Sequence, residues 1–242
     1  MSSETKMTFL EHFGILRKSF IKIIVFIAIL FVPAFLFREI LMELALVPIT
    51  ESIPNDSKII FTKPAEALSS NIRLALLTSF LCSFPLIIYE VWAFIGPGLY
   101  QKEKRISLMV IILGTALFFL GAFLCFKFVA PLTFNILLNE YSSESIIAFP
   151  NISDTLSFLS SLILSFGIIF EYPLIIFLLS KIGVVSSKFL SSKRKYAILI
   201  STIISAILTP TTDVFSMLFM LVPLVLFYEI GILISLVTYK KR

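Results

Sequence analysis

Six apolar segments run along this chain, and short polar stretches separate them. They cover residues 20–37, 67–94, 106–126, 156–179, 197–208 and 214–237. The runs are continuous rather than alternating, so each predicts a helix and not a strand of a membrane β-barrel. Five are long enough to cross a hydrocarbon core of about 30 Å. The 197–208 segment crosses it only if the helix extends over 195–209 and the bilayer thins locally.

Composition supports the same fold class. Hydrophobic residues make up 58% of the 242 residues and charged residues 14%, which is more apolar surface than a soluble domain of this size can bury. We therefore predict an all-α integral membrane protein with six transmembrane helices in a single domain over residues 1–242. The last two helices are expected to form a short hairpin.

Basic residues gather on one side of the predicted membrane. Of the 20 lysines and arginines, 15 lie before or at the start of the first span, after the second, after the fourth or in the C-terminal tail, four lie in the other stretches, and Arg73 is left uncounted. Cytoplasmic loops carry the excess of Lys and Arg, so both termini are predicted to be cytoplasmic. The net charge of +5 therefore reflects orientation in the membrane and does not indicate nucleic-acid binding.

The stretch before the first span predicts an amphipathic helix over residues 8–19. Thr8 and Glu11 fit a capping box at its start. Apolar side chains then recur on one helical face at Phe9, Phe13, Leu16 and Phe20. Such a helix lies at the cytoplasmic membrane surface, either as part of a binding site or as a simple anchor.

Two longer polar stretches, 38–66 and 127–155, are predicted to be loops on the outer side that contain short helical pieces. Residues 62–66 resemble a helix start, with Pro at a position where its missing N–H costs nothing. Pro210 and Asp213 predict a tight turn between the fifth and sixth spans.

Glu171 lies deep in the apolar segment 156–179, which has no other charged residue, and Pro173 follows two residues later. Burying a carboxylate in hydrocarbon costs at least ~2.5 kcal/mol, so this side chain should face protein or a polar cavity. Pro173 removes a backbone N–H and predicts a local bend. The plain interpretation of Glu171 is a hydrogen bond to a Ser or Thr of a neighbouring span, and the alternative is a functional carboxylate.

Other polar residues carry weaker signals. Glu229 lies inside the last span with no basic partner at helical spacing, and Glu90, at the inner end of the second span, is expected to be solvated. His12 is the single histidine, and the two cysteines lie within apolar runs, so neither a haem site, a zinc site nor a disulfide is predicted. Since no enzyme motif is present, we predict no catalysis and no cofactor.

Five stretches in the same order resemble the TatC family, the C subunit of the twin-arginine protein translocase. The most specific reads Tyr-Glu-Val-Trp-Ala-Phe-Ile-Gly-Pro-Gly-Leu-Tyr over 89–100 and is followed by Glu103. The others cover residues 10–18, 170–173, 208–216 and 227–231. The resemblance implies a glove-shaped receptor in the bacterial inner membrane. It would bind twin-arginine signal peptides of folded proteins, recruit TatA- and TatB-type single-span subunits, form homo-oligomers, and support export driven by the proton-motive force.

The resemblance also implies the site residues. The residues expected to bind the signal peptide are Glu103, Glu11, His12, Arg17, Phe94 and Tyr100. The residues expected to make intramembrane contacts or to dock partner subunits are Glu171, Pro173, Asp213, Met217 and Glu229.

The chain departs from the family pattern in its N-terminal helix and in its last hairpin. Ile15 stands where the family has a glutamate, and Ser19 stands where it has a second basic residue. Glu11 lies one helical turn before Ile15 and could present a carboxylate to the same arginines. Met217 replaces a usual glutamine in the last hairpin, whose turn is one residue longer here.

Two other functions remain compatible with the residues alone. Glu171 and Glu229 could serve a proton-coupled secondary transporter, although the chain has no inverted repeat. The chain could also be a structural scaffold subunit, which would not bind a signal peptide.

Overall fold

The computed structural model describes residues 9–50, 52, 59–95, 104–140, 149–209 and 213–239. These residues are almost entirely helical, with one isolated parallel bridge between Ile60 and Asn151. The α-helices are α1 (Phe9–Leu36), α2 (Arg38–Thr50), α3 (Glu66–Ile95), α4 (Lys104–Leu124), α5 (Ala130–Asn135), α6 (Ile152–Phe170), α7 (Tyr172–Lys181), α8 (Ser187–Ser192), α9 (Arg194–Leu208) and α10 (Val214–Thr238). Two π-helical turns, η2 (Cys125–Val129) and η3 (Ile136–Glu140), flank α5.

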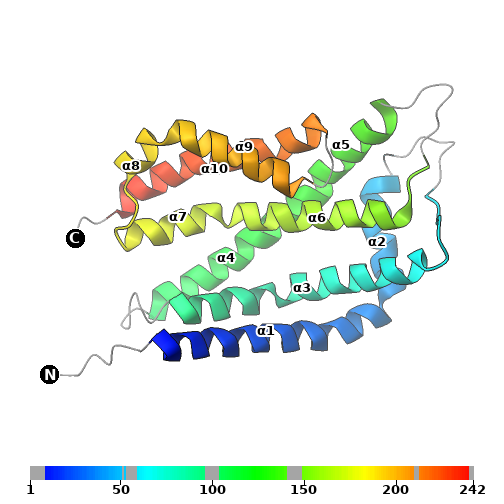
Figure 1. Ribbon diagram of the computed structural model, residues 1–242, viewed down its shortest axis with the longest axis horizontal. Coiled ribbons are helices and arrows are strands. Elements are labelled where there is room, and N and C mark those ends of the chain that lie inside the picture. Colours follow the sequence, from blue (N-terminus) through cyan, green and yellow to red (C-terminus); the bar gives the residue numbers. More distant parts are fainter. Residues whose placement is uncertain are drawn as a thin grey trace.

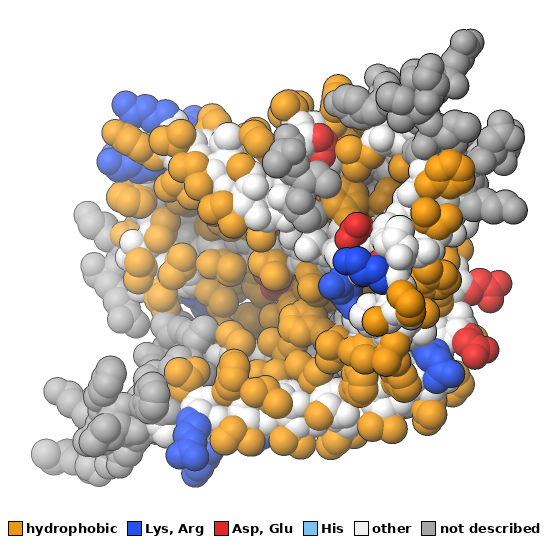
Figure 2. Space-filling view, turned by 45° about the vertical axis from the view of Figure 1, so that its right-hand side comes forward, with side chains coloured by type: hydrophobic (Ala, Val, Ile, Leu, Met, Phe, Trp, Pro, Cys, Tyr) orange, Lys and Arg blue, Asp and Glu red, His pale blue; other side chains and the backbone are white. Residues whose placement is uncertain are grey.

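The long helices lie side by side, and α4 crosses them obliquely (Figure 1). At one end of the bundle, α1 begins, α3 ends, α4 begins and α10 ends, next to α8. We call this the terminal end. The opposite, distal end holds α2, the start of α3 and the start of α6. Hydrophobic side chains cover most of the face seen in the space-filling view, as expected of a surface that contacts lipid (Figure 2).

The first helix joins two elements that the sequence separates. The amphipathic stretch and the first apolar segment form one continuous helix, α1, without a break near residue 19. α1 packs along α3, while outward side chains such as Phe20 and Val32 stay exposed. Since apolar side chains need no burial in lipid, one neighbouring helix is enough to hold α1.

The third span continues beyond its predicted end. A single helical path from Leu108 to Leu138 includes η2 and α5, so the expectation of a loop from residue 127 is wrong for its first part. Its 31 residues measure about 46 Å at the helical rise, which is longer than the hydrocarbon core. The lone charge at Lys127 does not stop the helix, because apolar residues continue after it and its exposed side chain lies on a π-helical turn.

The predicted bend at Pro173 is confirmed. α6 ends at Phe170 and α7 begins at Tyr172, so Glu171 sits between two helical segments. The Glu171 N–H donates to the carbonyl of Ile168 at 3.1 Å, and regular bonding resumes where the Ile175 N–H donates to the Glu171 carbonyl at 3.0 Å. The break thus places a carboxylate at a defined depth in the bundle.

The last two helices form the expected hairpin, with α9 packed on α10. Asp213 caps α10 by accepting a hydrogen bond from the Ser216 N–H at 2.7 Å, while Pro210 lies outside the described residues. Among the described residues, five helices are long and apolar enough to span a membrane, and α9, with 15 residues, is not among them. A crossing by α9 therefore still requires the local thinning that its sequence implies.

The core centres on α6, which packs against both α3 and α4. Its buried side chains include Leu156, Leu159 and Leu162. Glycines allow α4 and α6 to approach closely: a Cβ added at Gly121 would lie 2.7 Å from the carbonyl oxygen of Phe166. Small residues at helix contacts are the usual way in which membrane helices gain packing without a hydrophobic driving force.

Candidate functional site

A buried carboxylate joins α1 to α3 near the terminal end. Glu90 is 3% exposed, which corrects the expectation that it is solvated. Its Oε2 accepts a hydrogen bond from Ser19 Oγ at 2.6 Å, and its Oε1 accepts one from Lys22 Nζ at 2.9 Å. A buried carboxylate needs such partners. We refer to Ser19, Lys22 and Glu90 as the α1–α3 polar cluster.

The cluster defines which face of α1 points toward α3. Ser19 and Lys22 share that face, and Ile15, which stands where the family pattern has a glutamate, lies one turn before Ser19. Position 11 lies two turns before Ser19 in α1. Arg17 is exposed on another side of α1.

The other residues predicted to bind a signal peptide lie at the end of α3, at the start of α1 and beyond α3. Position 94 belongs to the last turn of α3, and position 12 to the first turns of α1. The side chains of Phe94, His12 and Glu11 are outside the described set, and Tyr100 and Glu103 lie outside the described residues altogether.

Glu171 is 7% exposed and lies against α4. A Cβ added at Gly114 would come within 3.2 Å of its Oε2, so the glycine makes room for the carboxylate. Its Oε1 is buried and has no hydrogen-bond partner among the described residues. Among the described residues, Oε1 therefore lacks the hydrogen bond to a Ser or Thr of a neighbouring span that the plain interpretation of the sequence predicts. An unpaired buried carboxylate oxygen is rare because its desolvation is not repaid.

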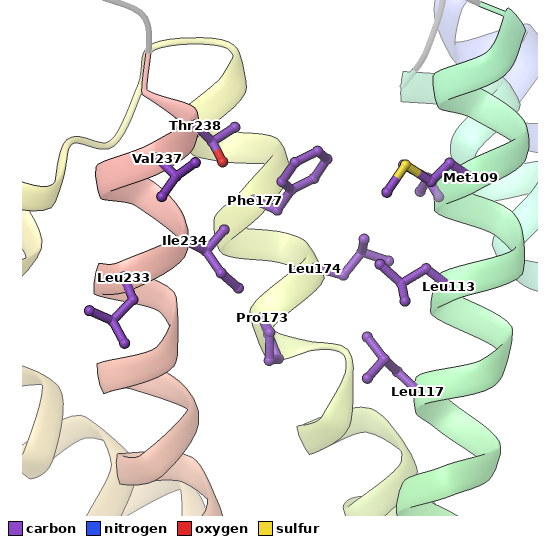
Figure 3. Close-up of a pocket in the computed structure, with 11 residues that line it drawn as sticks. Met109, Leu113, Leu117, Pro173, Leu174, Phe177, Leu233, Ile234, Val237 and Thr238 are labelled. Carbon is purple, nitrogen blue, oxygen red and sulfur yellow. The ribbon is translucent and has the colours of Figure 1, made fainter.

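An apolar groove of about 590 Å³ lies beside this break, between α4, α7 and α10. In the close-up view, α4 and α10 form its two walls and α7 lies between them (Figure 3). Pro173 and Leu174, which directly follow the break, are part of its lining.

Glu229 has a partner that the sequence did not reveal. Arg194 Nε donates to its Oε1 and Arg194 Nη2 to its Oε2, both at 2.8 Å. The two residues are 35 positions apart and come from α9 and α10. Both side chains are about half exposed, at 52% and 48%, so the ion pair lies on the outer surface of the hairpin.

The hairpin holds the other two predicted docking residues. The carboxylate of Asp213 caps α10, which accounts for an acidic residue at this position. Met217 follows in the first turn of α10 and is partly buried.

A third buried carboxylate, Glu66 at the distal end, was not singled out by sequence reasoning. Glu66 accepts hydrogen bonds from the Thr62 N–H at 2.7 Å, from Thr62 Oγ1 at 2.6 Å and from Asn151 Nδ2 at 2.9 Å. Asn151 in turn caps α6. These bonds join the two stretches predicted as outer loops, so the group is a structural tie between them.

Comparison with known proteins identifies the family. The family model for the Sec-independent protein translocase protein TatC matches residues 11–223. The chain belongs to the TatC family. It is 37% identical to the TatC of Desulforapulum autotrophicum over 239 residues, which cover 99% of this chain and 88% of that protein.

Other TatC proteins and two solved structures agree. TatC of Aquifex aeolicus is 36% identical, covering 98% of both chains, and TatC of Escherichia coli K12 is 32% identical, covering 97% of this chain and 90% of that one. Two crystal structures of the twin-arginine translocase receptor TatC superpose with TM-scores of 0.81 and 0.84 at 33% and 34% identity, over 93% of this chain and 98% or 99% of theirs. The TatC resemblance and the fold class are thus confirmed. The chain is a multi-pass membrane protein and a component of a protein translocase, which is a transport system rather than an enzyme.

Proposed function

We propose that this TatC protein is the receptor that binds twin-arginine signal peptides of folded proteins at the terminal end. The observation that supports it best is the α1–α3 polar cluster. The bond between Ser19 and Glu90 holds α1 against α3. Position 11 lies two helical turns before Ser19 in α1, and position 94 lies one turn after Glu90 in α3. The cluster therefore joins the two stretches that resemble the family's binding motifs.

The chemistry of recognition follows from the cargo. A guanidinium forms paired hydrogen bonds with a carboxylate, so two consecutive arginines require at least two acidic partners. Glu103 supplies one, and we assign the second to Glu11 because Ile15 cannot accept a hydrogen bond. Aromatic residues at 94 and 100 would contact the peptide beside the arginines, while His12 and Arg17 border the site from α1.

Recruitment of partners is assigned to the membrane interior. The unpaired oxygen of Glu171 would accept a hydrogen bond from a polar group on a TatA- or TatB-type helix or on the inserted signal peptide. Polar pairs of this kind contribute about 0.6–2 kcal/mol, so they set position rather than total affinity. The Arg194–Glu229 pair and Met217 offer a second contact region on the outside of the hairpin.

The proposed orientation places the terminal end of the bundle in the cytoplasm. Exposed basic side chains at the terminal end, such as Lys22, Lys188 and Arg194, favour a cytoplasmic location for both termini in a bacterial inner membrane. Signal peptides would then arrive from the cytoplasm, and export of the folded cargo would use the proton-motive force. A homo-oligomeric receptor complex is part of the same proposal.

Site-specific photocrosslinking tests the receptor function. Probes at positions 9, 13 and 101 are offered a twin-arginine precursor and, as a control, the same precursor with two lysines. We expect crosslinks with the arginine precursor alone, because lysine cannot form the paired bonds. Glu103→Gln should abolish them and Glu11→Gln should weaken them at least tenfold.

Two outcomes would contradict parts of this proposal. Equal crosslinking of both precursors in a correctly inserted protein refutes recognition of the arginine pair. If Glu11→Gln crosslinks like the wild type while Glu103→Gln loses its crosslinks, the role of Glu11 is refuted and the receptor function stands.

A further inference from the structure

We propose that α2 is an interfacial helix, which lies along the membrane surface at the distal end and inserts one apolar side into the acyl chains of that leaflet. The contact is made by Ile40, Leu44 and Val47, which we call the apolar stripe of α2. This inference does not rest on signal-peptide binding, because it concerns the opposite end of the bundle and needs only that the long helices cross the membrane.

The direction of α2 is the first observation. α2 runs across the long helices at the distal end of the bundle (Figure 1). It follows α1 after a bend at Phe37, where the Leu41 N–H donates to the carbonyl of Phe37 at 3.1 Å. Because the long helices cross the membrane, a helix that runs across them lies close to the plane of the membrane.

Three sides of α2 differ in chemistry. One side packs against α3 and α5 and buries Ala45, Pro48 and Ile49. The apolar stripe recurs at spacings of four and three residues, so its members share a second side, and they are 57%, 57% and 40% exposed. The third side carries Glu39 and Glu43, which are one turn apart and exposed. At about 100° per residue, the stripe lies between the packed side and the acidic side. This division suits an interface, with the stripe in acyl chains and the carboxylates in water.

The length of α1 places the start of α2 at the membrane boundary. Arg38, the first residue of α2, follows Lys22 by 16 residues, with no other charge between them. This stretch rises about 24 Å, and basic side chains that extend toward water at both ends bring the distance to about 30 Å, the thickness of the hydrocarbon core. The Arg38 Cζ lies 5.3 Å from the ring centroid of Phe35, so the guanidinium stays beside α1 at this level. α2 therefore begins where the acyl chains end.

Continuity with the lipid-facing surface of α1 selects lipid as the occupant. The exposed apolar side chains of α1 extend to its last turn, where Val32 and Leu36 are exposed. Phe37 is 61% exposed and links that surface to the apolar stripe, which the described helices leave largely uncovered. In water these side chains would form one contiguous apolar patch, which the surfaces of soluble proteins rarely carry. At the level of the acyl chain ends, the same patch is covered by lipid.

Thiol labelling tests whether the stripe lies in lipid. The full chain is placed in phosphatidylcholine vesicles and labelled from both sides with a charged maleimide that does not enter hydrocarbon. Ile40→Cys and Leu44→Cys probe the stripe, and Glu39→Cys and Glu43→Cys are the matched controls. All four positions are exposed in the folded chain, so protein packing alone predicts similar rates. We expect the stripe variants to react at least about tenfold more slowly, because the reactive thiolate forms in water and not in hydrocarbon.

Two references make this comparison quantitative. Each rate is divided by the rate of the same variant unfolded in sodium dodecyl sulfate, which removes differences in intrinsic reactivity. The wild-type chain gives the background from Cys82 and Cys125, which lie within membrane-spanning helices. Equal normalised rates at the stripe and at the acidic side would mean that the stripe faces water and is free for a partner subunit, and would overturn the proposal.

Dilution in lipid separates the bilayer from a second copy of the chain as the cover. Protection by lipid does not change when the lipid-to-protein ratio is raised, whereas protection by another copy falls by mass action. We expect the labelling rates of Ile40→Cys and Leu44→Cys to stay constant over a roughly tenfold range of this ratio. Rates that rise toward those of the acidic side on dilution would assign the stripe to an interface between copies and would refute the lipid contact.

Tryptophan fluorescence gives a direct measure of the same contact. Trp92 is the single tryptophan, so Leu44→Trp in a Trp92→Phe background reports on the stripe, and Glu43→Trp in that background is the control. An interfacial helix places its apolar side about 5–10 Å into the boundary between headgroups and acyl chains. Phosphatidylcholine with bromine near the headgroup end of its acyl chains should therefore quench Leu44→Trp more strongly than lipid with bromine near the chain ends, and more strongly than it quenches Glu43→Trp. Equal quenching of the two tryptophans would contradict the insertion of the stripe.

Discussion

Glu90→Gln tests whether the α1–α3 polar cluster holds the first helix in place. The substitution keeps the size of the side chain but removes its charge. The amide oxygen can still accept from Ser19 Oγ, now as a neutral bond, while the amide NH₂ meets the ammonium of Lys22, and two donors cannot bond. The cluster therefore loses its ion pair and weakens its buried hydrogen bond.

The magnitude follows from the exposure of the two partners. Hydrogen bonds to charged groups contribute about 1.5–3 kcal/mol and neutral ones about 0.5–1.5, so the buried bond to Ser19, which is 7% exposed, should lose about 1 kcal/mol. The Lys22 side chain is 63% exposed, so the ion pair contributes at most about 1 kcal/mol more. We expect Glu90→Gln to destabilise the protein by about 1–2 kcal/mol.

Thermal unfolding of the purified protein in detergent measures this loss. For a chain of this size, about 1–2 kcal/mol corresponds to a Tm lower by roughly 2–8 °C. Glu43→Gln, an exposed glutamate on α2, is the control with the same charge change and should melt like the wild type. If Glu90→Gln melts like the control, the cluster does not hold α1 on α3.

Three further changes give distinct results. Gly121→Ala forces a methyl group against the backbone of α6 and should destabilise the protein by about 1–3 kcal/mol in the same melting assay, whereas Gly14→Ala, with open space around it, should not; equal Tm values would contradict the packing. Glu171→Leu should preserve the fold but reduce co-purification of TatA- or TatB-type subunits and export of a twin-arginine cargo, and normal export would refute its assigned role. Arg194→Gln alone should lower Tm more than Arg194→Gln combined with Glu229→Gln, because the single variant leaves an unpaired carboxylate; purely additive effects would show that the ion pair is not coupled.

The sequence predicted those features that depend only on residues close together in the chain. The bend at Pro173 follows from a missing N–H, and the cap at Asp213 follows from a carboxylate that precedes a free helical N–H. The apolar runs predicted the spans because hydrocarbon forces backbone groups to bond within one helix. The end of the third span was misjudged, since one lysine in an apolar stretch interrupts the hydropathy pattern but not the helix.

The candidate site depended on contacts between segments far apart in the sequence. Glu90 is 71 residues from Ser19, and Glu229 is 35 residues from Arg194. No periodicity relates such pairs, so the sequence suggested a solvated Glu90 and an unpartnered Glu229. Only the packing of α1 on α3 and of α9 on α10 brings each carboxylate to its partner.

The sequence by itself determined the membrane environment, the helical class and the family, because these rest on hydropathy and on motifs of neighbouring residues. The tertiary structure decided which polar groups are paired and which are not. Whether a carboxylate such as Glu171 keeps an oxygen without a partner depends on what the neighbouring helices place beside it, here a glycine of α4. That outcome is set by the approach of helices in three dimensions, which the hydrophobic pattern of one helix does not encode.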